Sequence, residues 1–208
     1  MKVLLVNSSP RPMGCTYTAL SEIQKTLKEC GVDSEIFHLG NNPVRDCIAC
    51  GACAGKGKCA FGNEDMVNEL IDKAARSDGF VFGSPVYFAH PTGILQSVLD
   101  RAFFAGKSAF MYKPGAAVIS ARRGGNVASF DVINKYFTIS QMPIVSSTYW
   151  NMVYGSKSED VLRDEEGMQT MRNLARNMAY LLKCIDAGKK AGITRPEAET
   201  SAHTNFIR

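Results

Sequence analysis

Long apolar runs are absent from this sequence of 208 residues. No stretch approaches the roughly 20 consecutive apolar residues that cross a bilayer as a helix. The first residues carry one lysine and only a short apolar stretch before Asn7, which indicates a first strand and not a signal peptide. The sequence therefore predicts a cytoplasmic protein with no membrane partner.

Strong charge of either sign is also absent. The chain carries 24 Lys and Arg against 20 Asp and Glu, a net charge of +4, and it has no basic run of note. Surfaces that bind nucleic acid concentrate positive charge, so we expect no nucleic-acid partner. The small positive surplus suits anionic small ligands such as nucleotides.

Two common nucleotide-binding signatures are missing as well. The sequence has neither Gly-x-Gly-x-x-Gly, which marks dinucleotide sites, nor the Gly-x-x-x-x-Gly-Lys of nucleoside triphosphate sites. Its three histidines are scattered, so we predict no His-Cys or His-Asp nucleophile pair and assign no catalytic side chain. A mononucleotide is therefore the expected class of nucleotide ligand.

Strand and helix patterns alternate along the chain. Hydrophobic residues make up 45% of the sequence, and this predicts one α/β domain over residues 1–190, followed by a polar tail over 191–208. Apolar runs predict five strands, at residues 2–6, 34–39, 79–84, 115–120 and 143–149. Helical spacing predicts helices at about 16–30, from 63 or 64 onward, at 92–104 and at 168–182.

This alternation predicts a parallel sheet, because parallel strands need a crossover connection. Five strands suit the doubly wound order 2-1-3-4-5 with helices on both faces. Ligands of such sheets bind beyond the carboxyl ends of the strands, at the switch point between strands 1 and 3. The loops after strands 1, 3 and 4 are the unusual ones here, so we expect three loops to meet at one crevice.

The loop after the first strand has the composition of a phosphate site. It offers hydroxyls, backbone N–H groups, one arginine and a glycine that permits close approach. It leads into a helix whose N-terminus adds free N–H donors and the positive end of its dipole. A plain turn with a serine cap is the alternative. The candidate ligands are Ser9, Arg11, Gly14, Cys15, Thr16 and Tyr17.

The loops after the third and fourth strands have the composition of a ring site. One loop is apolar and aromatic where loops are usually polar, which favours stacking with a flat ring. The other offers cations and free N–H groups, which would stabilise the pyrimidine end of an anionic reduced flavin. The alternatives are core or dimer contacts and a solvated turn. The candidates are Pro85, Val86, Tyr87 and Phe88 in one loop, and Ala121, Arg122, Arg123, Gly124 and Gly125 in the other.

Four of the seven cysteines fall in one loop, residues 40–62. Cys47, Cys50, Cys53 and Cys59 have the spacing C-x2-C-x2-C-x5-C. The two overlapping close pairs let three thiolates converge, and a Gly-Lys-Gly segment can return the fourth, as in iron–sulfur sites. Zinc is one alternative, and free thiols able to form a disulfide are another.

These loops resemble those of a known family, the flavodoxin-like NAD(P)H-dependent FMN reductases. The segment from Ser8 to Thr16 is similar to their Gly-Ser-Pro-Arg-x-x-Gly-Asn-Thr phosphate loop, with serine for the first glycine and Cys15 for the asparagine. Residues 83–87 resemble their Gly-Ser-Pro-Val-Tyr flavin loop, and residues 121–125 resemble their third flavin loop. The four cysteines match the compact motif of the iron-sulfur flavoprotein branch.

The resemblance implies a flavodoxin-like fold, FMN as cofactor, one [4Fe–4S] cluster in that branch, and a homodimer or homotetramer. It also implies an oxidoreductase that takes electrons from NAD(P)H or a reduced electron carrier. The acceptor would be small, such as a quinone, a nitro compound or free flavin. Two other functions stay open: a non-enzymatic flavodoxin-like electron carrier, and a cysteine-based redox-sensing or metal-binding module.

Overall fold

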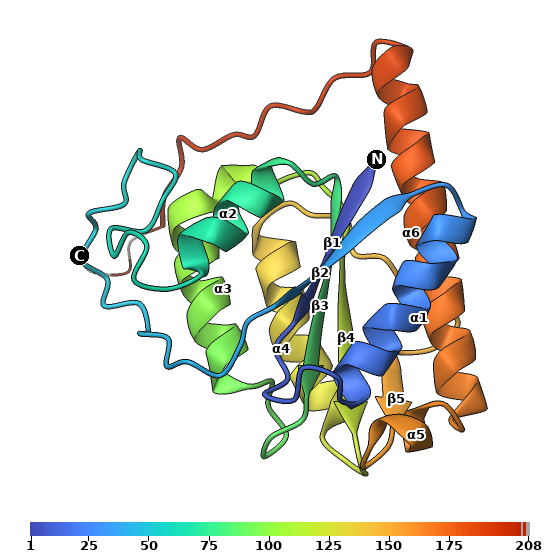
Figure 1. The fold of residues 1–208 in the computed structure, drawn as a ribbon. Coiled ribbons are helices and arrows are strands. Elements are labelled where there is room, and N and C mark those ends of the chain that lie inside the picture. Colours follow the sequence, from blue (N-terminus) through green and yellow to red (C-terminus); the bar gives the residue numbers. More distant parts are fainter. Residues whose placement is uncertain (205, 207–208) are drawn as a thin grey trace.

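The computed structural model describes residues 1–204 and 206, and it shows one sheet between two layers of helices (Figure 1). The strands are β1 (Lys2–Asn7), β2 (Asp33–His38), β3 (Gly79–Pro85), β4 (Gly115–Ala121) and β5 (Met152–Tyr154). The helices are α1 (Cys15–Glu29), α2 (Val67–Ala75), α3 (Gly93–Gly106), the 3-10 turn η1 (Lys107–Ala109), α4 (Asn126–Ile139), α5 (Ser158–Val161) and α6 (Glu165–Lys190).

The five strands run parallel in the order β2-β1-β3-β4-β5, which confirms the predicted order 2-1-3-4-5. Within the central ladder, Val6 of β1 pairs with Phe37 of β2 on one side and Phe82 of β3 on the other. After β1 the chain crosses to one side, and after β2 it crosses back. The carboxyl end of β1 is therefore the switch point, where a crevice opens.

Alternate residues of each strand feed two separate cores. Leu5 packs with α1 and α6 on one face, and Leu4 and Val6 pack with α2, α3 and α4 on the other. Figure 1 shows the same division, with α1 and α6 on one side of the sheet and α2, α3 and α4 on the other. Because both faces are covered, the strands are nearly continuous apolar runs, as is typical of parallel sheets.

The position predicted for the fifth strand was wrong. The predicted segment, residues 143–149, makes only an isolated bridge between Ile144 and Gly115. The chain then leaves the sheet, and the exposed Tyr149 and Trp150 lie in this excursion. Pairing resumes where the Ile119 N–H donates to the carbonyl of Asn151 at 2.9 Å, so β5 begins only at Met152. The interruption follows Val145, where the Ser-Ser-Thr run begins and the Ser146 carbonyl accepts from Asn177 Nδ2 of α6 at 2.8 Å, outside the sheet.

Two helices also differ from the sequence-based expectation. Helix α4 was not predicted, because only two apolar side chains, Ile133 and Phe137, are among its buried residues. Helix α2 begins at Val67 instead of residue 63 or 64. There the carboxylate of Asp65 accepts a hydrogen bond from the Val67 N–H at 3.1 Å. Neither difference changes the layers of the fold.

The end of the chain follows α6 without further regular structure. Residues 193–204 and 206 lie in neither a helix nor a strand. The predicted tail also includes residues 205, 207 and 208, which lie outside the described residues. Across the described chain, no helix is both long enough and apolar enough to cross a membrane.

Candidate functional site

The three loops predicted to meet do so around one hollow of about 260 Å³ at the carboxyl ends of β1, β3 and β4. Six of the residues predicted to bind FMN do not line it: Gly14, Tyr17, Phe88, Arg123, Gly124 and Gly125. Four lining residues were missed, two of them after the misplaced fifth strand. The lining residues are Ser9, Pro10, Arg11, Cys15, Thr16, Pro85, Val86, Tyr87, Ser120, Ala121, Arg122, Gly155 and Ser156.

The first loop, which follows β1, is shaped by the buried side chain of Asn7, a residue that no local pattern marks as functional. Its Oδ1 accepts from the Ser9 N–H at 3.0 Å, and its Nδ2 donates to the Pro12 carbonyl at 3.2 Å. The Arg11 N–H donates to the Ser9 hydroxyl oxygen at 3.2 Å, which tightens the turn. His38, at the end of β2, contacts the Ser9 carbonyl at 2.8 Å. The loop is therefore held from two strands before any ligand is present.

The N-terminus of α1 faces this loop without a cap. Gly14 is the N-cap residue, no side chain accepts from the first turn, and the first turn has no acidic residue. The first N–H groups of an α-helix have no partner within the helix, so an uncapped end next to the exposed Arg11 is suited to an anion. A Cβ on Gly14 would approach Arg11 Cβ to 3.1 Å, so the glycine permits this close turn.

Thr16, at the start of α1, and Ser120, near the end of β4, meet at the floor of the hollow. Their hydroxyl oxygens lie 2.8 Å apart, and both side chains are buried. Beside them, the Cys15 thiol lies 3.5 Å from the Gly155 carbonyl. Burial raises the pKa of the Cys15 thiol, with Asp160 adding to the rise. Cys15 therefore stays protonated near neutral pH and is a hydrogen-bond donor instead of a nucleophile.

The third loop, which follows β3, is a tight, strained turn. The N–H groups and carbonyls of Tyr87 and His90 exchange two hydrogen bonds of 2.9 Å. The two residues between them, Phe88 and Ala89, have φ angles of 51° and 62°. Hairpin turns of this kind favour Asn-Gly, because residues with a Cβ are strained at positive φ. The Phe88 side chain is fully exposed, so no packing within the chain offsets the strain.

The fourth loop, which follows β4, packs closely against the third loop at Gly125. This glycine has a φ of 91°, and a Cβ there would lie 2.8 Å from both Ala89 Cα and Val86 Cγ1. The neighbouring Gly124 has open space around it. Arg122 lines the hollow, whereas the exposed Arg123 does not. Gly125 therefore sets the distance between the two loops without touching the hollow.

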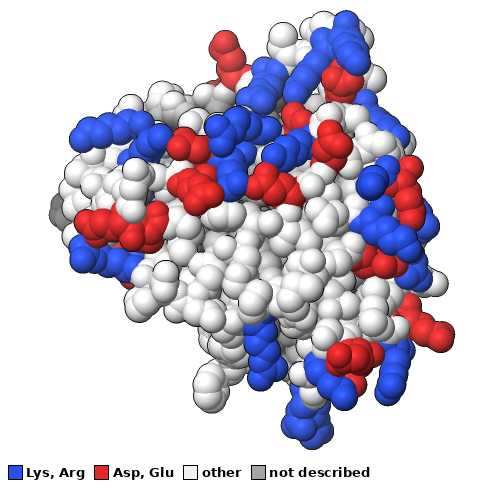
Figure 2. All heavy atoms as spheres, in the orientation of Figure 1, with Lys and Arg blue, Asp and Glu red and all other residues white. Residues whose placement is uncertain are grey.

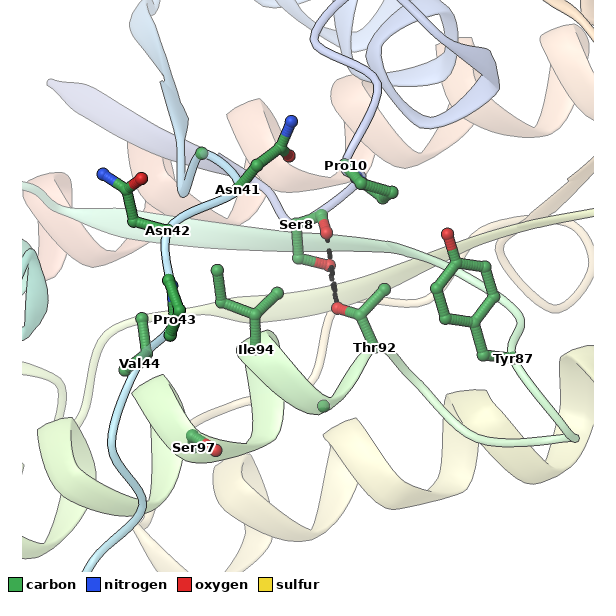
Figure 3. Close-up of a pocket in the computed structure, with 12 residues that line it drawn as sticks. Ser8, Pro10, Asn41, Asn42, Pro43, Val44, Tyr87, Thr92, Ile94 and Ser97 are labelled. Atoms are coloured by element: carbon green, nitrogen blue, oxygen red, sulfur yellow. Dashed lines mark hydrogen bonds between the residues drawn. The ribbon is translucent and has the colours of Figure 1, made fainter.

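A second hollow of about 340 Å³ lies on the other side of Tyr87 and Pro10, between the first strand's loop, residues 40–44 and the start of α3 (Figure 3). Its floor is the buried pair Ser8 and Thr92, whose hydroxyls hydrogen-bond at 2.9 Å. Each hollow is near the lower end of the roughly 300–1,000 Å³ typical of small-molecule sites. Because they share two lining residues, the hollows are neighbours.

The hollow where the three loops meet is lined by two exposed basic side chains, Arg11 and Arg122. In Figure 2, Lys, Arg, Asp and Glu gather around the end of the sheet where the strands begin and over α1 and α6. The middle and lower left of the same view are mostly uncharged, whereas basic and acidic side chains lie together at its lower right. Such a surface suits an apolar ring that carries an anionic group.

The four clustered cysteines line a third, much smaller hollow of about 20 Å³, against Arg101 of α3. Cys47 and Cys50 are exposed, and Cys53 and Cys59 are half-buried. Among the described residues, no three His, Cys, Asp or Glu side chains are close enough to hold a metal ion. The donor chemistry still suits an iron–sulfur group, because four thiols share one hollow and a buried guanidinium donates to one of them, Cys59 Sγ, at 3.3 Å.

The fold and this site define a flavodoxin-like protein with a crevice at the switch point of its sheet. The chain belongs to the NADPH-dependent FMN reductase family, whose model matches residues 1–157. An iron-sulfur flavoprotein of Methanocaldococcus jannaschii is 31% identical over 193 residues, 89% of this chain and 99% of that protein. An FMN-dependent NADPH-azoreductase of Staphylococcus saprophyticus is 34% identical over 102 residues, 49% of this chain and 52% of that protein.

The solved structures agree on the fold. A flavodoxin from the domain Archaea superposes with a TM-score of 0.61 at 14% identity, covering 88% of this chain and 99% of that one. The comparisons confirm the resemblance to FMN reductases and to iron-sulfur flavoproteins. The assignment of individual residues to FMN or to a cluster stays a prediction.

Proposed function

We propose that this chain is an FMN-dependent oxidoreductase that takes electrons from NAD(P)H or a reduced electron carrier and passes them to a small acceptor. The observation that carries the proposal is the meeting of three loops, each unusual in sequence, around one hollow at the switch point of the sheet. When bound, FMN supplies the hydride and electron chemistry, and the protein supplies position and electrostatics.

The phosphate would bind at the first loop. Ser9 and Thr16 offer hydroxyls within the hollow, Arg11 offers a cation, and the uncapped start of α1 offers N–H groups. Charge-assisted contacts of this kind contribute about 1.5–3 kcal/mol each. Because Thr16 is held by Ser120, its hydroxyl is already oriented, and little entropy is lost when it binds an anion.

The ring would lie against Pro85, Val86 and Tyr87, with Ala121 and Arg122 at its edge. A guanidinium at the pyrimidine edge favours the reduced anionic ring, so Arg122 would make the flavin easier to reduce. The neighbouring hollow beyond Tyr87 provides room for the second reactant, whether a nicotinamide or an acceptor such as a quinone, nitro compound or free flavin. The azoreductase relative supports a reductase of small aromatic molecules.

The phosphate assignment can be tested by titrating the apoprotein with FMN and following flavin fluorescence. Arg11→Ala and Thr16→Ala should each weaken FMN binding about ten- to a hundredfold. Arg76→Ala is the matched control, since Arg76 is an exposed arginine before β3, at the opposite end of the sheet from the hollow. If Arg11→Ala and Thr16→Ala both bind FMN like the control, the phosphate binds elsewhere.

We further propose that Cys47, Cys50, Cys53 and Cys59 bind one [4Fe–4S] cluster. Their shared hollow, the thiolate-donor chemistry and the iron-sulfur flavoprotein relatives support this. The thiols must draw together to do so, and positive-φ glycines at positions 51, 55 and 57 lie in the segment that would move. Without a cluster, the chain would be a two-electron FMN reductase with thiols that are structural or redox-sensing.

Iron and sulfide content after anaerobic reconstitution tests the cluster. We expect about four iron atoms per chain in the wild type and a large loss in Cys50→Ser. Cys184→Ser is the control, because this exposed cysteine lies on α6, outside the loop. Iron uptake that is the same in both variants would refute the assignment.

Two further measurements address the remaining parts of the proposal. Steady-state oxidation of NADH or NADPH distinguishes a reductase from a non-enzymatic electron carrier, which would show none. Light scattering tests the proposed homodimer or homotetramer, for which the fully exposed Phe88 and the exposed Trp150 offer apolar contact surface.

A further inference from the structure

Arg101 is the most unusual charged residue of this molecule. It projects from the middle of α3 and is only 2% exposed, beneath the cysteine loop. Its Nε donates to Cys59 Sγ at 3.3 Å, and its Nη1 donates to the Arg45 carbonyl at 3.0 Å and to the carboxylate of Asp65. The guanidinium also lies 4.8 Å from the ring centroid of Phe61. Three of these contacts, to Arg45, Cys59 and Phe61, tie α3 to the cysteine loop, and the fourth ties it to Asp65 just before α2.

One nitrogen of this guanidinium makes none of these hydrogen bonds. Arg101 Nη2 is buried and has no hydrogen-bond partner among the residues that the structure describes. An unsatisfied buried donor is costly, more so when it carries charge, and it calls for an explanation. Arg101 lines the same hollow as all four clustered cysteines. Anionic sulfur bound in that hollow is the kind of acceptor that this cation lacks.

We propose that Arg101 positions the cysteine loop and sets the reduction potential of the iron–sulfur group, an inference that rests on the cluster proposed above. Its Nε donates to the sulfur of Cys59, and its Nη2 would be free to donate to other sulfur atoms of the bound group. Asp65 fixes the plane of the guanidinium, and its carboxylate offsets part of the charge.

The direction of the effect follows from charge. Reduction adds an electron, so a nearby cation and N–H donors to sulfur stabilise the reduced form more than the oxidised form. The interaction is strong because the Arg101 side chain is 1% exposed, where water screens poorly. Arg101 therefore raises the potential, and its loss lowers it.

Arg45 offers a matched control for charge. Its guanidinium also lies 4.8 Å from the Phe61 centroid, yet its side chain is 61% exposed. Replacing either arginine by glutamine removes one positive charge beside the same ring. Only the substitution at 101 removes a buried charge and the hydrogen bond to Cys59. A charge effect that acts through solvent would appear in both variants, whereas the proposed effect appears in one.

The experiment uses the anaerobically reconstituted full chain with FMN, with iron content and a potentiometric titration followed by electron paramagnetic resonance. For Arg101→Gln we expect reduction to become at least tenfold less favourable, which is 59 mV for a one-electron couple. Arg101→Lys keeps the charge but loses the Nε contact, so its decrease should be smaller. Arg45→Gln should change the equilibrium less than twofold.

The outcomes separate this inference from the cluster proposal. If the wild type takes up iron and both Arg101 variants keep it at the wild-type potential, Arg101 has no such role. If the wild type takes up no iron, both the cluster proposal and the proposed role of Arg101 are refuted. The FMN proposal is tested separately by the FMN titration. Loss of iron in both Arg101 variants supports the positioning role when circular dichroism of their apoproteins matches the wild type.

A folding defect is controlled by a variant that removes the buried ion pair as a unit. Replacing one partner leaves an uncompensated buried charge, whereas removing both charges together avoids that cost. Arg101→Met combined with Asp65→Asn removes both charges and keeps the side-chain oxygen that accepts from the Val67 N–H, so this double variant should fold. We expect it to lose iron or to show the lowered potential. A folded double variant with wild-type iron content and potential would overturn the inference.

Discussion

Gly125→Ala should disturb the junction of two loops, whereas Gly124→Ala beside it should not. Gly125 has a φ of 91°, where a residue with a Cβ is strained by about 1–2 kcal/mol. The added Cβ would lie 2.8 Å from Ala89 Cα, a backbone atom that no rotamer change can move away. Overpacking of this kind costs about a further 1–3 kcal/mol.

These terms predict a loss of about 2–5 kcal/mol in the free energy of unfolding of Gly125→Ala, if the loops keep their places. If the turn at Ala89 moves away instead, the energetic cost of overpacking is relieved. FMN affinity then falls, because Val86 and Tyr87 move with the turn. Gly124 does not have a positive φ, and a Cβ added there would point into open space. Gly124→Ala should therefore change stability by less than about 0.5 kcal/mol.

Urea denaturation of the two apoproteins measures the first effect, and FMN titration measures the second. Compared with Gly124→Ala, Gly125→Ala should have a lower free energy of unfolding, a weaker affinity for FMN, or both. Equal stability together with equal FMN affinity would show that the two loops do not meet at Gly125 as described.

Three other positions give predictions that separate variants can test. Combining Phe88→Asn with Ala89→Gly should raise the unfolding free energy of the apoprotein by about 1–2 kcal/mol, since both residues have positive φ; unchanged stability in urea would mean that the turn is not strained. Asn7→Ala should weaken FMN binding about tenfold in the fluorescence titration, because the substitution leaves the buried Ser9 N–H unpaired. Wild-type affinity would show that Asn7 does not shape the loop. Burial lowers the pKa of Lys113 to about 8, below its unfolded value of 10.5, so the unfolded chain binds more protons at Lys113 between these values, and this residue makes stability rise with pH across that window. In urea curves, the stability of the wild type should therefore increase relative to that of Lys113→Met between about pH 8 and pH 10.5. The same pH dependence in both proteins would contradict this.

Much of this protein was determined by local sequence. The apolar strands β1, β3 and β4 are short runs bounded by turn residues, and their parallel pairing follows because helices separate them. The loop after β1 and the Pro85-Val86-Tyr87 loop could be singled out because their residues are unusual for ordinary loops. Any parallel sheet with this order brings such loops together, so the crevice was predictable from the sequence.

Tertiary structure decided the features that depend on distant partners. The fifth strand was misplaced because pairing resumes at Asn151, where the partner is the backbone of β4, and no local pattern marks that point. Ser120 and Gly155 joined the site only because folding brings the ends of β4 and β5 beside the first loop. Arg101 is 42 residues away from Cys59 in the sequence. In sequence it is one charged residue in a helix, and only its burial against the cysteine loop gives it a partner sulfur, because burial removes the water that would otherwise satisfy it.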